Sequence, residues 1–552
     1  MTPGTQAGTQ PAAQPPLDMV TAVLASADAH GASPALSSGK RTVGYAQLGR
    51  QIRSTAASLV QEGLLPGERV LFSVRPGPAA VVLALGVVLA GGTVVFADPG
   101  AGEALFSARA KLAKPAWVAA ESLLYLASSP PLRPLARSRG LDLPRYSRLI
   151  PRARHIRSGP WLPGTPTSAL DASRLAARAA DPAVVGRLER EADPAAQALV
   201  VFTSGTTAQP RAVTHTRGSL GAGLADFASG VGLKAGQRVL TDQLMVGVPA
   251  LIAGAHWTLP PHGARPGADA ESYLSLMAQT EVLFAVPAVM DALLSGLERR
   301  PELAPPRLQT LALGGAPVLE PLLRRMHERF PEAAIRCIYG MTEILPVAIA
   351  DGVEKLAAGT GPDGGDRMGR LVSSVRARLD GDELLLSGPG LALGYLADLP
   401  ENPLTELRTG DLARLDGDEL TLLGRSKDMF IRGTQNVYPG LYEPLIAGVE
   451  GVEHAFLTGV PDRIGDDSIV LVVVPSNAPP RSLSGDHPVL DTLRVALPGL
   501  MDAGALPDTI LVAADIPRSG RGSKPDRAAL AAAVGQYLAG GDTAEPGRRR
   551  QA

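Results

Sequence analysis

Short apolar runs alternate with segments rich in alanine and leucine through the first three quarters of the chain. Such runs are typical of buried strands, and strands that alternate with helices form mainly parallel sheets covered by helices. The alternation therefore predicts an α/β fold. The clearest strand-like runs are residues 69–74, 93–97, 198–202, 282–286 and 310–313.

The pattern changes near Gly381, where short apolar runs separated by tight turns predict a small β subdomain. After Gly424 a compact α+β unit is expected, ending in a helix over 526–538. A chain of 552 residues is also too long for a single ordinary core. We therefore predict a disordered lead over 1–16, an N-terminal domain over 17–424, a C-terminal domain over 425–539 and a disordered tail over 540–552.

Composition excludes several function classes. The net charge of -1 provides no global field that would attract nucleic acid. The single cysteine, Cys337, cannot form an internal disulfide or a multi-cysteine metal site, which fits a reducing compartment. The uncharged stretch 79–97 contains three glycines and is interpreted as a buried helix followed by a buried strand. A cytoplasmic protein is expected.

The strongest local signal is a loop of hydroxyl-bearing and small residues that follows the apolar run 198–202. Small residues let backbone N–H groups approach an anion, hydroxyls add donors, and Arg211 adds positive charge. The loop lacks the Gly-Lys-Ser/Thr ending of kinase and GTPase P-loops. It predicts a phosphate cradle formed by Thr203, Ser204, Gly205, Thr206, Thr207 and Arg211.

This loop resembles the phosphate loop of the adenylate-forming superfamily, which includes acyl-CoA synthetases, peptide-synthetase adenylation domains and firefly luciferase. Further stretches resemble that family's motifs in the same order along residues 40–535. They are 89–92 with 98–100, Gly315-Ala316-Pro317 after Gly314, Tyr339-Gly340-Met341-Thr342-Glu343, 381–395, Thr409-Gly410-Asp411, 424–428 and 517–527.

The resemblance implies a large N-terminal domain of two α/β subdomains plus a β subdomain, and a small mobile α+β C-terminal domain. It implies activation of a carboxylic acid by ATP and Mg²⁺, with release of pyrophosphate and transfer to CoA, and a fatty acid is the expected substrate. Tyr339 would face adenine beside Gly315, Ala316 and Pro317, and Asp411 with Arg425 would hold the ribose. Thr342 would contact the α-phosphate, and Glu343 would bind Mg²⁺.

The C-terminal motifs imply a second set of roles. Lys524 would bridge the substrate carboxylate and ATP, and Lys427 would be the hinge about which the C-terminal domain turns. Gly433 and Thr434 would line the path of the CoA thiol. Lysine is rare in this chain, seven of 53 basic residues, so each lysine is more informative than usual.

Departures from the family pattern leave two other functions open. Thr434 stands where the family usually has glycine, and its side chain would narrow the thiol path. Together with the sequence over 339–348, this resembles the β-lactone synthetases, which close a long-chain β-hydroxy acid without CoA. The third hypothesis is a non-catalytic nucleotide-binding scaffold, although Glu343 and Lys524 are both present.

Residues 133–157 contain eight arginines and a single acid, Asp142. One hypothesis is a peripheral contact with the headgroup layer of a membrane, at its inner face. The other is a solvated basic loop in an arginine-rich protein. The expected partners are otherwise a small-molecule carboxylic acid and CoA, with no nucleic acid, and no sequence feature indicates an oligomeric state.

Overall fold

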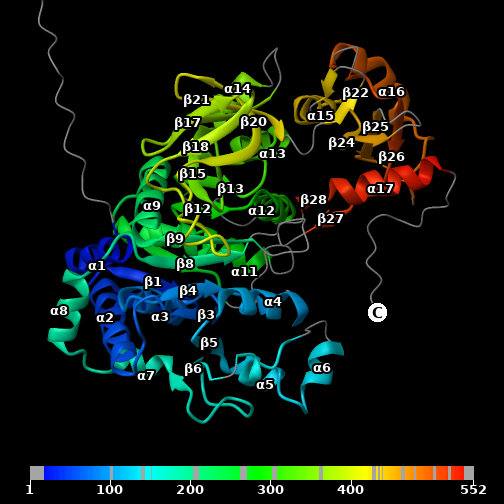
Figure 1. Cartoon of the computed structure of the whole chain (residues 1–552). Coiled ribbons are helices and arrows are strands. Elements are labelled where there is room, and N and C mark those ends of the chain that lie inside the picture. The colour runs from blue at the N-terminus through cyan, green and yellow to red at the C-terminus, as the bar shows by residue number, and fades with distance from the viewer. Residues whose placement is uncertain are drawn as a thin grey trace, which may run out of the picture.

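The computed structural model carries most of the chain in helices and strands arranged as two large sheets and a smaller C-terminal unit (Figure 1). The predicted lead and tail lie outside the described residues. The structure describes residues 18–99, 103–138, 143–150, 152–202, 211–261, 270–300, 308–359, 365–425, 430–432, 435–437, 439–461, 467–477, 480, 482–501, 505–519 and 524–539.

The first sheet has eight strands, and six of them run parallel to one another from β8 to β7. β9 and β19 are added antiparallel at the edge beside β8. The order across the sheet is β19 (Gly394–Tyr395), β9 (Ala212–Thr216), β8 (Gln197–Phe202), β4 (Thr93–Phe96), β3 (Arg69–Ser73), β5 (Trp117–Glu121), β6 (Arg154–Ser158) and β7 (Leu170–Asp171).

The second sheet has thirteen strands, parallel from β14 to β1 and antiparallel elsewhere. Its order is β17 (Arg376–Asp380), β18 (Glu383–Ser387), β20 (Leu407–Asp416), β21 (Glu419–Arg425), β16 (Asp366–Leu371), β15 (Ile344–Asp351), β14 (Ala334–Met341), β13 (Thr310–Gly314), β12 (Val282–Ala285), β10 (Arg238–Leu240), β11 (His256–Leu259), β1 (Pro34–Ser38) and β2 (Arg41–Gly44).

The β-rich part after Gly381 is continuous with this second sheet. Strand β16 pairs with β15 on one side and with β21 on the other, so the antiparallel strands extend the α/β sheet by direct hydrogen bonding. A sequence pattern gives the class of each strand but not its neighbour, because the pairing partners are far apart in the chain. The predicted β subdomain is therefore an extension of one sheet.

Helices cover both sheets, and a single buried cluster joins the two sheet faces through α1, α2, α3, α9 and α10. The helices of this larger body are α1 (Met19–His30), α2 (Tyr45–Gln61), α3 (Pro78–Leu89), α4 (Glu103–Ala113), α5 (Ser122–Ala127), α6 (Arg133–Ser138), α7 (Ala172–Ala177), α8 (Pro182–Arg190), α9 (Arg217–Val231), α10 (Leu244–Ile252), α11 (Ala270–Met277), α12 (Pro287–Arg299), α13 (Glu320–Arg329) and α14 (Gly352–Ala358).

The uncharged stretch 79–97 forms helix α3 followed by strand β4, as predicted. Pro78 lies in the first turn of the helix, where its missing N–H is not needed, and Gly91 takes a positive φ of 85° in the turn after it. The apolar side chains of α3 are buried between the sheets. Within the described part of the chain, no helix combines the length and apolar character that crossing a membrane requires.

A pair of buried charges fixes the packing of α1 on α9. Asp18 caps α1 by accepting a 2.7 Å hydrogen bond from the backbone of Thr21. The same carboxylate pairs with Arg217, the first residue of α9, whose Nη2 donates to Asp18 Oδ1 at 2.8 Å. Both side chains are less than a tenth exposed. A pair this buried is strongly destabilising to break, because removing one partner leaves the other charge unpaired.

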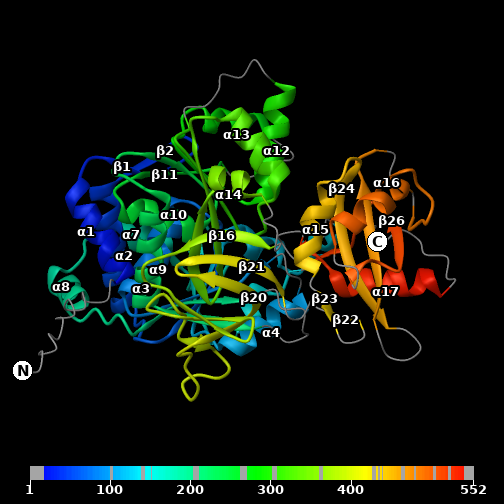
Figure 2. The ribbon, with the colours of Figure 1, turned by 90° about the horizontal axis from the view of Figure 1, so that it is seen from above.

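The C-terminal unit forms a separate lobe beside the larger body in both views (Figures 1 and 2). It has its own apolar clusters, packed on the two faces of the β24–β25–β26 sheet. Its elements are β22 (Phe430–Arg432), β23 (Gln435–Val437), α15 (Pro439–Ala447), β24 (Val452–Pro461), β25 (Asp467–Pro475), α16 (Val489–Ala496), β26 (Thr509–Val512), β27 (Arg518–Ser519), β28 (Lys524–Pro525) and α17 (Arg527–Leu538).

The basic segment 133–157 is more regular than the loop that the sequence predicts. It contains α6 and ends in β6, in which His155 and Ile156 are buried. Several of its arginines pair with carboxylates of the fold. Arg133 and Arg137 bind Glu103, Arg154 binds Glu62 and lies over the ring of Trp117, and Arg157 binds Asp171. These ion pairs give the charges a structural role, and a membrane contact stays a prediction.

Candidate active site

The phosphate loop connects two hydrogen-bonded strands of the first sheet. β8 runs into residues 203–210, which include Thr203, Ser204, Gly205, Thr206 and Thr207 and lie outside the described residues, and β9 returns antiparallel after Arg211. The Arg211 side chain is exposed, and its guanidinium carbon lies 5.6 Å from the centre of the Tyr395 ring. The hairpin therefore places a cation at the predicted loop.

Thr342 and Glu343 form the turn between β14 and β15 of the second sheet. The buried His215, in β9 of the first sheet, reaches this turn: its Nε2 lies 2.7 Å from the carbonyl oxygen of Thr342 and must donate to it. Its Nδ1 lies 3.2 Å from the Ser219 hydroxyl, which is then the donor. Burial lowers the pKa of His215, so the neutral ring is favoured. The two sheets are thus joined at the Thr342–Glu343 turn.

Tyr395 approaches the same turn from β19. Its hydroxyl donates a 2.9 Å hydrogen bond to Oε1 of Glu343. Burial, with the nearby negative charge of Glu343, raises the pKa of Tyr395 to about 12. The phenol therefore stays protonated and acts as a donor. The backbone of Glu343 is held as well, because its carbonyl accepts a 2.8 Å bond from the amide of Ala392.

The predicted nucleoside residues also come together. Tyr339 in β14 donates from its hydroxyl to Oδ2 of Asp411 in β20 at 2.5 Å. Asp411 is almost fully buried, and its amide binds the Thr409 hydroxyl at 3.0 Å. Asp411 lies opposite Arg425 in the β20–β21 register. A carboxylate held beside an aromatic face suits a ribose next to a base.

Gly315, Ala316 and Pro317 follow the end of β13, next to the strand that carries Tyr339. Gly315 has a positive φ of 81°, which turns the chain sharply as it leaves the sheet. β13 and β14 are parallel, so their carboxyl ends share one edge, which is where ligands bind in open α/β sheets.

The donor set fits Mg²⁺ held among phosphates. Glu343 supplies one half-buried carboxylate at the site. Within the described residues, no group of three or more histidine, cysteine, aspartate or glutamate side chains forms a metal cluster. Mg²⁺ is usually bound through one or two carboxylates together with substrate phosphates and waters. Glu343 would hold the ion, whose chemistry is to offset charge on the phosphates.

Other predicted residues are placed only in part. Arg425 lies at the end of β21 and Lys524 in β28, but their side chains are outside the described part of the structure. The hinge residue Lys427 and the tunnel residues Gly433 and Thr434 lie outside the described residues altogether. Their roles stay predictions.

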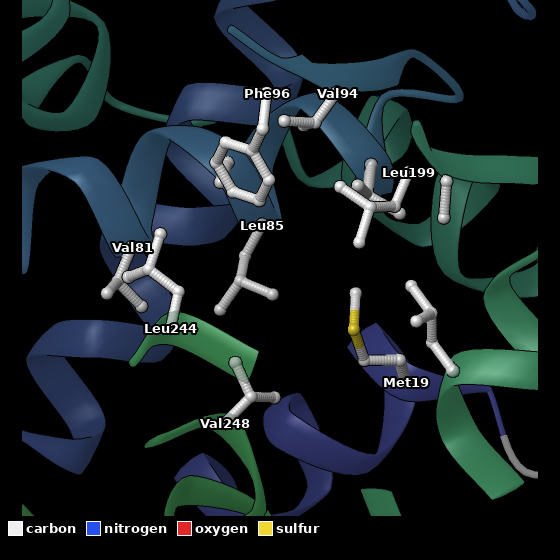
Figure 3. A pocket seen from close by; sticks show the side chains of 12 residues that line it. Met19, Val81, Leu85, Val94, Phe96, Leu199, Leu244 and Val248 are labelled. Carbon is white, nitrogen blue, oxygen red and sulfur yellow. The ribbon is translucent and has the colours of Figure 1, made fainter. Parts of the chain in front are cut away.

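An apolar cavity of about 50 Å³ lies between the first sheet and the helices behind it (Figure 3). Side chains of α3, β4, β8, α9 and α10 surround it, with Met19 of α1. Figure 3 shows Leu85, Leu244 and Val248 pointing into the space with Phe96 above them. Its lining is aliphatic and aromatic, so it has no groups suited to a nucleotide. The lining residues are Met19, Val81, Ala84, Leu85, Val88, Val94, Phe96, Ala198, Leu199, Leu220, Leu244 and Val248.

Comparison with known proteins agrees with this geometry. The sequence profile of the AMP-binding enzyme family matches residues 23–396, which is more than half of the chain. The chain belongs to the AMP-binding enzyme family.

Curated relatives of this AMP-binding enzyme include acid–CoA ligases. An indoleacetate–CoA ligase of Aromatoleum aromaticum is 27% identical over 362 residues, covering 60% of this chain and 66% of the relative. A long-chain-fatty-acid–CoA ligase of Mycobacterium tuberculosis is 28% identical over 348 residues, covering 57% and 65%. The matched part thus spans just under two thirds of these relatives.

The fold of this AMP-binding enzyme also matches solved structures. An amide bond synthetase from Marinactinospora thermotolerans superposes with a TM-score of 0.73 at 20% identity, covering 94% of this chain and 99% of that one. The match confirms the predicted adenylate-forming fold, with a large N-terminal body and a small α+β C-terminal unit.

Two residues at the site of this AMP-binding enzyme were not predicted. His215 is 127 positions from Thr342, and Tyr395 is 52 positions from Glu343. Tyr395 ends the stretch 381–395, which resembles a family motif, but that resemblance assigned it no role. The available signal for His215 was a histidine four positions after Arg211, the basic end of the phosphate loop, in the run Ala212–Thr216.

Proposed function

We propose that this chain activates a carboxylic acid with ATP and transfers the acyl group to CoA. In the first step a carboxylate oxygen attacks the α-phosphorus, the bond to the β-phosphate oxygen breaks, and pyrophosphate leaves. In the second step the thiol attacks the acyl carbon, loses its proton, and AMP leaves. The observation that carries the proposal is the junction at which Tyr395 contacts both Glu343 and Arg211. Tyr339, which pairs with Asp411, lies four residues before Glu343 along the chain.

The charges at this junction match the first step. A carboxylate that approaches a triphosphate brings negative charge to a polyanion, so positive charge must lie nearby. Arg211 provides a guanidinium beside the phosphate loop. The Glu343 carboxylate would hold Mg²⁺, and Lys524 is proposed to reach the same centre from the C-terminal domain. Turning of residues 425–539 about Lys427 would then exchange the groups used in the two steps.

We further propose that the acid is aliphatic. Helix α10 has the sequence LMVGVPALI, and with α3 and β8 it surrounds the apolar cavity. Leu199 lines the cavity and lies three residues before the end of β8, so the cavity is about 10 Å from the start of the phosphate loop. The fatty-acid ligase among the relatives supports this choice.

Acid-dependent exchange of labelled pyrophosphate into ATP tests the first step, with a panel of fatty and aromatic acids. Exchange is expected with aliphatic acids, and mass spectrometry with CoA present should detect the acyl-CoA. Glu343→Gln keeps the shape and removes the charge, so turnover is expected to fall about 100-fold or more. No exchange with any acid would contradict the proposal.

The second candidate is the lactone-forming reaction, which the threonine at position 434 favours. Lactone closure needs only the substrate's own hydroxyl near the acyl carbon, at a high effective concentration. A β-hydroxy acid would then give AMP and a neutral lactone without CoA. Thr434→Gly separates the two functions. In a CoA ligase it should lower the KM for CoA or leave it unchanged, and in a lactone-forming enzyme no thioester should appear.

A further inference from the structure

Tyr395 touches two groups of opposite charge that the proposed function assigns to different ligands. Its hydroxyl binds Glu343 Oε1 at 2.9 Å, and its ring lies 5.6 Å from the guanidinium carbon of Arg211. The backbone of Tyr395 is held in β19, opposite Val213 of β9. The neighbouring amide of Leu396 donates to the carbonyl of Ala212 at 2.8 Å, one residue after Arg211.

The two charged groups do not neutralise one another. Within the described residues, Arg211 and Glu343 form no ion pair, although both contact the same tyrosine. A guanidinium and a carboxylate at one site ordinarily pair directly, often with two hydrogen bonds. Such a pair would occupy the carboxylate oxygens that a metal requires and the donors that a phosphate requires. Each of the two charged groups contacts Tyr395 instead.

We propose that Tyr395 is a positioning residue that holds the Glu343 carboxylate and the Arg211 guanidinium apart, each oriented for its own part of a metal–nucleotide complex. This role rests on the proposed function. The hydroxyl fixes one carboxylate oxygen and leaves the second for the ion, because a carboxylate offers about four acceptor positions. The ring attracts the guanidinium by a cation–π contact, and the guanidinium also interacts with the phenol oxygen.

The chemistry of Tyr395 suits positioning. The phenol hydroxyl donates to Glu343 while the backbone of Tyr395 is held in β19, so the donor has a fixed position. The Ala392 amide binds the backbone carbonyl of Glu343. This backbone bond fixes the turn, and the tyrosine hydroxyl orients the carboxylate. Loss of the hydroxyl alone should therefore affect the metal and spare the fold.

Two variants separate the parts of this role. Tyr395→Phe keeps the ring and removes the hydrogen bond. Tyr395→Ala removes both and lets Arg211 approach Glu343. Tyr45→Phe is the matched control, because the Tyr45 hydroxyl also donates a hydrogen bond, at 2.6 Å to the carbonyl of Ala255, remote from the site.

The main measurement is the affinity for Mn²⁺ in the presence of a non-hydrolysable ATP analogue, read by electron paramagnetic resonance of the free ion. Tyr395→Phe is expected to weaken Mn²⁺ binding about 10-fold, as for loss of a hydrogen bond to a charged group. Its melting temperature should stay at the wild-type value. Tyr395→Ala should weaken binding further, whereas Tyr45→Phe should leave Mn²⁺ affinity unchanged.

The Mg²⁺ dependence of pyrophosphate exchange is the second measurement. Tyr395→Phe should need about 10-fold more Mg²⁺ for half-maximal exchange and should recover most of the wild-type rate at saturation. Unchanged Mn²⁺ affinity in Tyr395→Phe would overturn the proposal. So would a parallel fall in melting temperature and affinity, which indicates a merely structural residue. If the wild type exchanges with no acid, the proposed function fails, while Mn²⁺ affinity still reports on Tyr395.

Discussion

Helix α9 packs against β15 through glycine, and this contact predicts how a single methyl group would disturb the site. A Cβ added at Gly223 would lie 2.4 Å from the carbonyl oxygen of Leu345. An ordinary contact needs about 1 Å more. The obstacle is backbone and cannot rotate away, so α9 and β15 must separate. Leu345 is two residues after Glu343, and the movement therefore reaches the Thr342–Glu343 turn.

The change in the free energy of unfolding for Gly223→Ala follows from two opposing effects. Overpacking of this kind costs about 1–3 kcal/mol, and a rigid backbone obstacle places it near the upper end. Replacing glycine by alanine within a helix stabilises by about 1 kcal/mol. The expected net loss in the free energy of unfolding is about 2 kcal/mol. A shift of about 1 Å at a catalytic turn also lowers turnover about 100-fold.

Gly230 on the same helix is the matched control. Its added Cβ would meet Cδ1 of Ile349 at 2.2 Å, which is the free end of a flexible side chain. Rotation of that side chain relieves the contact, so Gly230→Ala should be neutral or stabilising by up to about 1 kcal/mol. Urea unfolding and pyrophosphate exchange measure both variants. Equal stability and equal activity of Gly223→Ala and the wild type would refute the reasoning.

Lys524→Ala should reduce pyrophosphate exchange about 100-fold with an unchanged melting temperature, because its cation is proposed to act only in the transition state. Near wild-type exchange would exclude that role. Asp18→Asn should destabilise by about 3–5 kcal/mol in urea unfolding, since it leaves Arg217 buried and unpaired, and an unaffected midpoint would show that the pair is not needed. Burial lowers the pKa of His215 below its ordinary value of 6.5. The stability that the buried neutral ring contributes is therefore fully present above pH 6.5 and is lost as the pH falls through the lowered pKa of the folded protein. His215→Gln keeps a donor for Thr342 and should reduce the loss of unfolding free energy as the pH falls. An unchanged loss would show that other groups cause it.

The sequence was most informative where a local pattern determines the outcome. Apolar runs predicted β3, β4, β8, β12 and β13 to within about a residue, because burial of a strand requires side chains that the strand itself carries. The motif 339–343 was identified by its resemblance to a family motif, and the structure places Tyr339 in β14 and Glu343 in the turn before β15. The local pattern also identified the α3–β4 pair within 79–97.

Contacts between distant segments could not be predicted in this way. The continuity of β16 with β15, the pairing of β19 with β9, and the reach of His215 to Thr342 each depend on how two parts of the chain meet. The ion pairs of residues 133–157 belong to the same class, because no local pattern in the sequence indicates their partners, Glu62, Glu103 and Asp171. Pairing geometry of this kind is set by tertiary packing.

The meeting of the two sheets at one turn has a consequence for anyone who alters this enzyme by random mutation and selection. Substitutions that change activity should accumulate along the α9–β15 seam and beside β9, outside the residues assigned to the nucleotide. Gly390 also lies on this seam, since a Cβ there would be in ordinary contact with Gly223 at 3.7 Å, and the chain that follows it leads into β19 and Tyr395. A library restricted to the residues assigned to the nucleotide would miss these positions, whereas one that samples the seam could alter the proposed metal site without changing any residue in it.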